Sequence, residues 1–213
     1  MHSQIEAILF DFDGVLADTE PLHWSCWNEA LQTLGVSITW EAYSAHCIGI
    51  SDKAFLEALG RVSTPPRSLD ELWPTYPLKK KLFAERATRG GLISAETKAL
   101  LEELHSIPLA VVTSSATSEI RAILETEKVL DCFQATVYGD EVTNLKPHPE
   151  PYLTAMQRLG VSSAIVLEDS GPGIASGRAA GCEVLEVKHA SDVPALLRAR
   201  LNGQLSLPAS LLE

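Results

Sequence analysis

Two aspartates separated by a single residue, Asp11 and Asp13, come directly after a short apolar run near the start of the chain. Residues two apart in extended backbone point to the same side, so both carboxylates can face one site. Gly14 follows them and permits a sharp turn of the chain. In such a pair, one carboxylate can act as a nucleophile while the other moves a proton.

Further polar residues stand where other strands of a sheet are expected to end. Ligands of open parallel sheets bind outside the carboxyl ends of the strands, so these side chains are expected to gather at one site. Crowded carboxylates need a cation among them, and hard oxygen ligands favour Mg²⁺. A lysine and a hydroxyl beside such a cation indicate a phosphoryl site, where positive groups hold oxygens while a carboxylate attacks phosphorus. The residues concerned are Thr113, Ser114, Lys146, Glu168 and Asp169.

Short apolar runs alternate along the chain with longer helical patterns, which predicts βαβ units and a parallel sheet of the α/β class. The predicted strands are Ile5–Phe10, Leu109–Thr113, Thr136–Tyr138, Ala164–Leu167 and Glu183–Val187, and their apolar runs favour cover by helices on both faces. The helices expected between and after them are Ala95–His105, Thr117–Lys128, Glu150–Leu159, Ile174–Ala180 and Val193–Leu201.

The alternation is interrupted between Phe10 and Leu109, where about ninety residues stand in place of a simple crossover of about thirty. We expect an inserted all-helical subdomain over residues 16–89, with the α/β core formed by residues 1–15 and 90–213. Arg89-Gly90-Gly91 is interpreted as a hinge at which the chain returns from the insertion to the core. The helices predicted in the insertion are Pro21–Leu34, Trp40–Cys47, Asp52–Leu59 and Leu69–Ala87.

The composition narrows the class of protein further. Hydrophobic residues make up 46% and charged residues 21% of the 213, which excludes a disordered or fibrous chain. The net charge of −11 argues against nucleic acid or an anionic membrane as partner. The densest basic run, Lys79-Lys80-Lys81, could supply a cation from the insertion, but such a run more often forms a solvated face, which is the expectation here. No signal peptide or apolar span of about 18 residues is found, and four widely spaced cysteines favour free thiols, so we expect a cytoplasmic protein.

Four segments in this order resemble the motifs of the haloacid dehalogenase superfamily: DFDGVLADTE, VVTSS, LKPHPEPY and LEDSGPGI. The chain is most similar to the phosphatase and β-phosphoglucomutase-like branch, and the resemblance extends from about Ile5 to Val187. It implies a Rossmann-like parallel sheet core with a helical cap inserted after the first motif. The second aspartate argues against a dehalogenase, which lacks this acid.

The resemblance also implies roles for single residues. Asp11 matches the nucleophile that forms an aspartyl-phosphate, and Asp13 matches the general acid/base. Thr113 matches the phosphate-binding hydroxyl, although its neighbour Ser114 leaves the register open by one residue. Lys146 matches the phosphate-binding lysine that restrains the charge of the nucleophile. The metal ligands implied for Mg²⁺ are Asp11, Asp13 (through its backbone carbonyl), Glu168 and Asp169.

The cap offers fewer signals. His23 stands where relatives place a substrate-facing histidine, but it can equally fill a helix interface with neighbouring tryptophans. Gly49-Ile50-Ser51-Asp52 resembles the cap loop that reaches into the active site, with Gly49, Ser51 and Asp52 as candidate substrate contacts. Asp52 occupies the position of the β-phosphoglucomutase arginine, and a negative charge there would repel a second phosphate.

Three functions are therefore compared. The leading prediction is a Mg²⁺-dependent phosphomonoesterase that hydrolyses a small phosphorylated metabolite, with a sugar phosphate as the favoured class. The alternative is a β-phosphoglucomutase-like isomerase, which the aspartate at position 52 disfavours. A non-catalytic binding module is a distant third, because no nucleophile, acid or metal ligand is missing. The expected partner is a small-molecule phosphate ester, and a monomer is expected, with a dimer left open.

Overall fold

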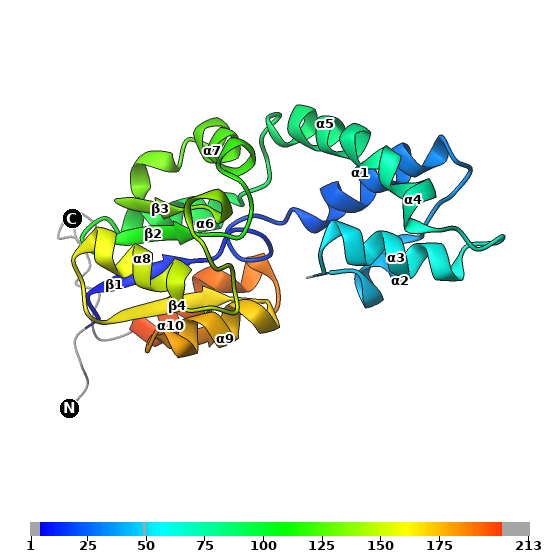
Figure 1. Ribbon diagram of the computed structural model, residues 1–213. Helices are drawn as coiled ribbons and strands as arrows, with labels where there is room; N and C mark the ends of the chain where they lie inside the picture. Colours follow the sequence, from blue (N-terminus) through cyan, green and yellow to red (C-terminus); the bar gives the residue numbers. More distant parts are fainter. Residues whose placement is uncertain (1–4, 49, 202–213) are drawn as a thin grey trace.

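The computed structural model describes residues 5–48 and 50–201, and its core is a five-stranded parallel sheet in the order β3-β2-β1-β4-β5 (Figure 1). Parallel pairing brings all five carboxyl ends to one edge, which faces the second lobe of the molecule. Each strand lies within two residues of its predicted range, so the expected α/β, Rossmann-like class is confirmed. The strands are β1 (Ala7–Phe10), β2 (Leu109–Val112), β3 (Ala135–Val137), β4 (Ala164–Glu168) and β5 (Glu183–Glu186).

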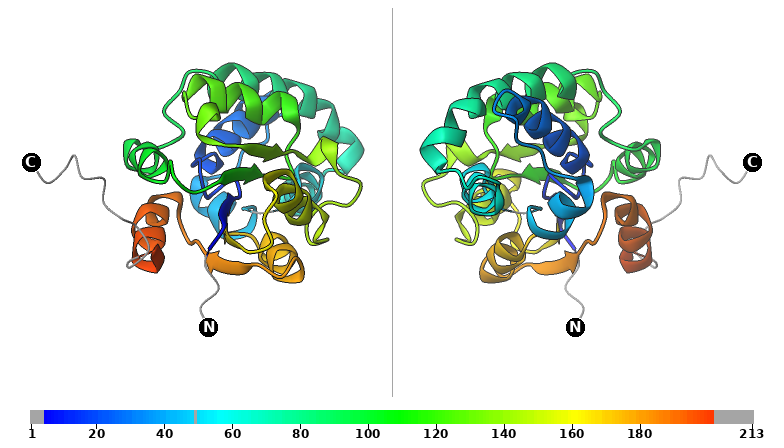
Figure 2. Two further views of the ribbon diagram at one scale, coloured as in Figure 1. Left: turned by 90° about the vertical axis from the view of Figure 1, so that its left-hand side faces the viewer. Right: turned by 90° about the vertical axis from the view of Figure 1, so that its right-hand side faces the viewer.

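Alternate residues of the strands enter two different hydrophobic clusters. Ile8 and Phe10 of β1 pack with helices on one face, whereas Leu9 packs against the opposite face. In both views of Figure 2, α6 and α10 lie on one side of the sheet and α8 and α9 on the other. Edge strand β5 is only partly buried, so the prediction of cover on both faces is wrong for this strand. The helices of this lobe are α6 (Ala95–Glu103), α7 (Thr117–Thr126), α8 (Glu150–Leu159), α9 (Gly171–Ala179) and α10 (Val193–Leu201).

The second lobe consists of helices between β1 and α6, as the expected insertion requires (Figure 1). Its own core is built around Trp27, which is 1% exposed, and Leu31, Phe55 and Leu72 pack with it. The elements are α1 (Glu20–Gln32), α2 (Trp40–His46), α3 (Asp52–Val62), α4 (Leu69–Leu72), the 3₁₀ turn η1 (Trp73–Thr75) and α5 (Tyr76–Ala87).

One helix prediction in this lobe is wrong. The stretch Leu69–Ala87 is not one helix but α4, η1 and α5, because Pro74 and Pro77 each stand in the first turn of a new element. Ser68 is the N-cap of α4 and forms a capping box with Glu71, so this short helix has its own defined start. Among the described residues, no helix has the length and apolar character needed to cross a membrane.

The two connections between the lobes lie side by side. The N–H of Asp18 donates a hydrogen bond of 3.1 Å to the carbonyl of Leu92. Leu92 in turn donates its own N–H to Glu127 Oε1 at 2.7 Å, which ties the returning chain to the end of α7. Residues 202–213 of the expected core lie outside the described residues, and the exact bounds of core and cap stay a prediction.

Candidate active site

A cavity of about 730 Å³ lies between the carboxyl edge of the sheet and the helical lobe, and both aspartates of the first motif line it. Asp11 continues the sheet, since its N–H donates to the carbonyl of Leu167 at 3.0 Å. Gly14 turns the chain back with a φ of +75°. A Cβ at this position would lie 2.1 Å from Asp169 Oδ2, so a side chain there would displace that carboxylate. The first motif therefore delivers two carboxylates to the cavity floor and leaves room for a third.

Lys146 is buried between two carboxylates. Its Nζ lies 2.5 Å from Asp11 Oδ1, 2.6 Å from Glu168 Oε1 and 2.9 Å from the carbonyl oxygen of Val112. Burial disfavours the ammonium, but the charges of Asp11 and Glu168 outweigh it and raise the pKa of Lys146. Burial also raises the pKa of Asp11 well above its ordinary value, and Lys146 opposes this effect. The lysine thus holds the carboxylate of Asp11 in place and offsets its charge.

Glu168 ends β4 and is fully buried, and both of its carboxylate oxygens accept hydrogen bonds. Tyr152 donates its hydroxyl to Oε1 at 2.8 Å, while the backbone N–H and hydroxyl of Ser170 bond Oε2. A Cβ at position 173 would lie 1.7 Å from Glu168 Oε1, so Gly173 is required for this carboxylate to stand where it does.

Asp11, Glu168 and Asp169 each place a carboxylate oxygen within 4.8 Å of the others. Burial, followed by the neighbouring Glu168, raises the pKa of Asp169 to about 6. Lys146 is the one lysine that the described residues place among these three carboxylates, and further positive charge would relieve their repulsion. Hard carboxylate oxygens are the ligands that Mg²⁺ prefers, so this donor set fits the metal predicted from the sequence.

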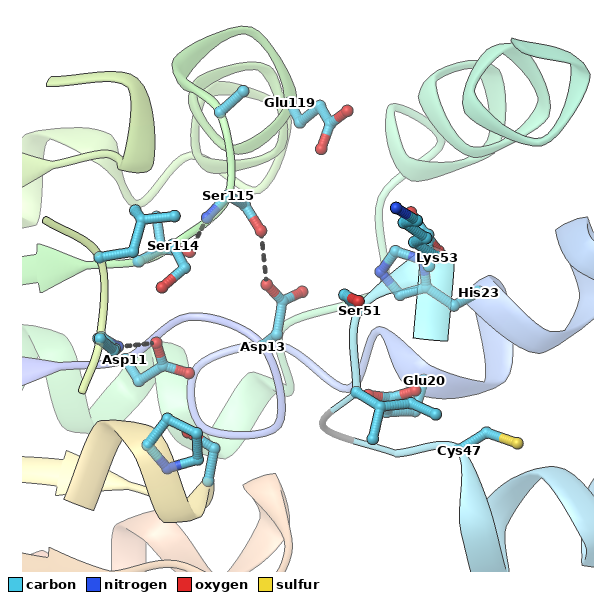
Figure 3. A pocket seen from close by; sticks show the side chains of 18 of the residues that line it. Asp11, Asp13, Glu20, His23, Cys47, Ser51, Lys53, Ser114, Ser115 and Glu119 are labelled. Carbon is cyan, nitrogen blue, oxygen red and sulfur yellow. Dashed lines mark hydrogen bonds and ion pairs between the residues drawn. The ribbon is translucent and has the colours of Figure 1, made fainter. Parts of the chain in front are cut away.

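Asp13 is oriented by two hydroxyls rather than by the lysine. Thr19 donates to Oδ1 at 2.6 Å. Ser115 donates to Oδ2 at 3.1 Å (Figure 3). The N–H of Ser115 in turn donates to Thr113 Oγ1 at 3.0 Å, which fixes the turn after β2. Thr113 is buried, whereas the adjacent Ser114 is exposed in the cavity, so both remain candidates for binding phosphate.

The structure brings together every core residue singled out in the sequence, and it adds three. Thr19 and Ser115 hold Asp13, and Tyr152 holds Glu168. Ser115 had a sequence signal, because it follows the predicted strand end directly. Thr19 and Tyr152 stand in the quoted segments DFDGVLADTE and LKPHPEPY, but the sequence did not indicate what their hydroxyls hold. The carboxylate of Asp13 is outside the three-carboxylate cluster found in the described residues, and a metal contact through its carbonyl stays a prediction.

His23 lines the cavity from α1 and also packs in a helix interface, against Phe83 rather than a tryptophan, so a contact of His23 with substrate stays a prediction. Its ring stacks on Phe83 at a centroid distance of 4.2 Å and an angle of 15°. Burial and the charge of Lys79 lower the pKa of His23 to about 4, so the ring is neutral at pH 7. Ser51 lines the same cavity and caps α3 by accepting from the N–H of Ala54 at 3.2 Å. The candidate Gly49 lies outside the described residues.

Asp52 is not an isolated negative charge. Lys79 Nζ lies 2.9 and 3.0 Å from its two carboxylate oxygens, and Trp27 Nε1 donates to Oδ1 at 2.9 Å. The expectation of a solvated lysine face is therefore wrong for Lys79, which is only 3% exposed. The expected repulsion of a second phosphate by Asp52 alone does not follow either, because Lys79 compensates its charge.

Further cap residues line the cavity without having been predicted (Figure 3). Lys53 follows Asp52 and faces the core from the cap side. Lys80 forms an ion pair of 2.7 Å with Glu119 of α7 and so connects the two lobes. Trp73 lines the cavity from η1. Lys80 was considered only as part of the lysine run, and the positions of Lys53 and Trp73 carried no sequence signal, because the packing of the cap helices decides which side chains face the core.

Comparison with known proteins identifies the family. The family model described as haloacid dehalogenase-like hydrolase matches residues 8–187. The "Phosphorylated carbohydrates phosphatase" of Thermotoga maritima is 32% identical over 202 residues, covering 92% of this chain and 91% of that protein. The "Fructose-1-phosphate phosphatase" of Escherichia coli K12 is 30% identical over 194 residues, covering 88% and 99%. The crystal structure of CbbY from Rhodobacter sphaeroides in complex with phosphate superposes with a TM-score of 0.69 at 28% identity, covering 86% and 87%. The chain belongs to the haloacid dehalogenase-like hydrolases and is an enzyme of their phosphatase type.

Proposed function

We propose that the protein is a Mg²⁺-dependent phosphomonoesterase that acts on a small phosphorylated metabolite, with phosphorylated carbohydrates as the favoured class. One observation carries the proposal: the Asp11 carboxylate lies 2.5 Å from a buried lysine at the floor of the cavity, within reach of Glu168 and Asp169. The names of relatives that act on phosphorylated carbohydrates and fructose 1-phosphate support the substrate class.

In the first step, a carboxylate oxygen of Asp11 attacks phosphorus, and the bond between phosphorus and the leaving alcohol breaks. Asp13 gives a proton to the departing oxygen, so the alcohol leaves neutral. Thr19 and Ser115 hold the carboxyl group of Asp13 toward the cavity for this transfer. Lys146 and the hydroxyl of Ser114 are the groups we assign to the phosphoryl oxygens.

In the second step, water attacks the phosphorus of the aspartyl-phosphate. Asp13, now ionised, takes a proton from that water, and the bond between Asp11 and phosphorus breaks to release inorganic phosphate. The two carboxylates return to their starting protonation states, so the cycle balances. The cap limits the entry of water during the first step, which favours transfer to Asp11 over direct hydrolysis.

Asp11, Glu168 and Asp169 are the side chains that would hold Mg²⁺. When bound, the ion would neutralise negative charge on the phosphoryl group and on the carboxylates around it. The residues of the chain accomplish the rest: Tyr152 and Ser170 keep Glu168 oriented, and Lys146 offsets the charge of Asp11.

A β-phosphoglucomutase-like isomerase remains the second candidate, because it would use the same two aspartates and the same lysine. The compensation of Asp52 by Lys79 removes the repulsion that the sequence predicted, but it also leaves Lys79 engaged rather than available to a second phosphate. The phosphatase therefore stays the favoured proposal.

The test measures phosphate release from a panel of sugar phosphates, phosphoglycolate and nucleotides, with Mg²⁺ and with EDTA. Glucose 1-phosphate is assayed separately for conversion to glucose 6-phosphate after priming with glucose 1,6-bisphosphate. We expect Mg²⁺-dependent release that Asp11→Asn abolishes and that Asp18→Asn, a change at an exposed aspartate outside the cavity, leaves intact. A phosphorylated peptide containing Asp11, trapped by rapid acid quench, would support the intermediate. Isomerisation with little release would favour the mutase, and activity retained in Asp11→Asn would refute the nucleophile.

A further inference from the structure

The cavity wall formed by the cap contains an exposed aromatic ring. Trp73 lines the cavity and is 39% exposed, although tryptophan is one of the largest apolar side chains. Its ring stacks on Tyr76 at a centroid distance of 4.6 Å and an angle of 20°. Tyr76 stacks in turn on Trp27 at 6.3 Å, and Trp27 is 1% exposed in the core of the cap. A ladder of three rings therefore connects the exposed indole to a rigid support.

Other apolar side chains line the same cavity and are also exposed. Ile50 of the cap is 42% exposed, and Leu145 of the core is 47% exposed. Single exposed apolar side chains are ordinary on a protein surface, but three that line one cavity from separate segments mark a place for an apolar ligand surface. The cavity thus has an exposed aromatic ring on its cap wall, whereas the proposed phosphoryl site lies at the strand ends of the core.

The cap wall carries little net charge. Lys79 is paired with Asp52, and Lys80 is paired with Glu119. His23 is neutral because burial and Lys79 lower its pKa to about 4. The wall also contains one further acid and one further lysine, Glu20 and Lys53, whose charges are opposite (Figure 3). A second phosphate at this end would bring about two negative charges to a wall whose cations are largely engaged.

We infer that the cap end of the cavity binds the leaving group as an uncharged ring stacked on Trp73, so that the preferred substrate carries a single phosphate on an alcohol that bears such a ring. This rests on the proposed function and assigns a specificity-determining residue to it. Sugars and nucleosides share the required chemistry, because a sugar presents a face of C–H groups and a nucleobase presents a planar aromatic face, and either can pack on an indole. Acyclic esters such as glycerol 3-phosphate and phosphoglycolate cannot pack on the Trp73 ring in this way.

The test measures binding in an Asp11→Asn background by isothermal titration calorimetry, so it does not depend on turnover. The probes are glucose 6-phosphate, uridine 5′-monophosphate, glycerol 3-phosphate and glucose 1,6-bisphosphate. Trp73→Ala is compared with Trp73→Phe, which keeps a ring, and with Leu78→Ala. Leu78 is 37% exposed on the neighbouring helix α5 and does not line the cavity, so it is a matched control.

We expect Trp73→Ala to weaken binding of the two ring monophosphates by several-fold to about tenfold, as the loss of one stacked ring contact implies. Glycerol 3-phosphate should bind unchanged, Trp73→Phe should retain most of the affinity, and Leu78→Ala should have no effect. Glucose 1,6-bisphosphate should bind the parent more weakly than glucose 6-phosphate. The relative affinity for the hexose and the nucleoside ester distinguishes the two sources of the ring.

The inference is overturned if Trp73→Ala weakens ring and acyclic esters equally, or if the bisphosphate binds at least as tightly as the monophosphate. Thermal melting of each variant shows whether the cap stays folded, and Trp73→Phe keeps the test valid if the alanine variant does not. Absence of turnover in the unmodified enzyme would contradict the proposed function alone, because the binding measurements would still decide the role of Trp73.

Discussion

The ion pair between Lys79 and Asp52 gives the most discriminating test of how the cap is built. The Lys79 side chain is 4% exposed and the Asp52 side chain 31% exposed, so the two partners lie in different surroundings. Lys79 Nζ also lies 5.3 Å from the Trp27 ring centroid and 5.7 Å from that of Phe83. We therefore expect the two single substitutions, Asp52→Asn and Lys79→Met, to have unequal costs.

The magnitudes follow from what each substitution leaves behind. Asp52→Asn leaves a buried ammonium with no carboxylate partner, and the cap should lose about 3–5 kcal/mol of unfolding free energy. Lys79→Met leaves a carboxylate that is partly hydrated and still accepts from Trp27, so about 1–2 kcal/mol is expected. The double variant leaves no uncompensated charge, and its loss should be about 1 kcal/mol, well below the sum of the single losses.

Urea denaturation followed by tryptophan fluorescence measures these losses in the right part of the molecule, because all four tryptophans lie in the cap helices α1 and α2 and the turn η1. Lys81→Met is the matched control, since this lysine is in the same helix and its side chain is 72% exposed. Equal costs for the two single substitutions, or additive costs in the double variant, would refute the interpretation of Lys79 as a buried and fully engaged charge.

Two further predictions concern the core. Gly173→Ala should reduce activity or metal affinity by about 10–100-fold, because the new Cβ would displace Glu168. Gly171→Ala should change neither, because a Cβ at position 171 meets open space. Calorimetric Mg²⁺ titration of both variants checks this prediction. Burial raises the pKa of Glu127, but the ion pair with Lys98 and the backbone hydrogen bond it accepts outweigh this and lower it below 4.5. The stability that Glu127 contributes is therefore present above pH 4.5 and is lost as the pH falls through the lowered pKa. Glu127→Gln should flatten the acid side of a profile of unfolding free energy against pH, measured by urea titration. At pH 7 the substitution should cost about 1 kcal/mol of unfolding free energy. An unchanged profile would contradict this assignment.

The core of the site could be predicted from the sequence because its residues follow local rules. Each of Asp11, Thr113 and Asp169 comes directly after an apolar run, and parallel pairing necessarily brings the ends of such runs to one edge. Lys146 stands before a helix that packs on the same sheet, so the topology also limits its position. No long-range contact has to be known for these residues to be brought together.

The cap could not be predicted in the same way, because its contacts depend on how helices pack. Lys79, Lys80 and Lys81 are adjacent in sequence, yet the first is buried, the second pairs with a core helix and the third is solvated. Successive residues of a helix point about 100° apart, so their surroundings depend on the helix phase relative to its neighbours. The start of α5 at Tyr76 was also predicted wrongly, because the expected single helix over Leu69–Ala87 passes through Pro74 and Pro77, each of which stands in the first turn of a new element.

This difference separates chemistry from specificity. The groups assigned to phosphoryl transfer lie at strand ends, where a substitution in the cap does not reposition them. The groups that we propose to face the leaving group lie on α1, α3, η1 and α5. Their surroundings depend on partners distant in sequence, as for Asp52 with Lys79, 27 residues away. A change of one helix phase in the cap could therefore alter which esters are bound without altering how they are cleaved. The cap contacts of this chain, rather than its motifs, are therefore the basis for proposing its substrate.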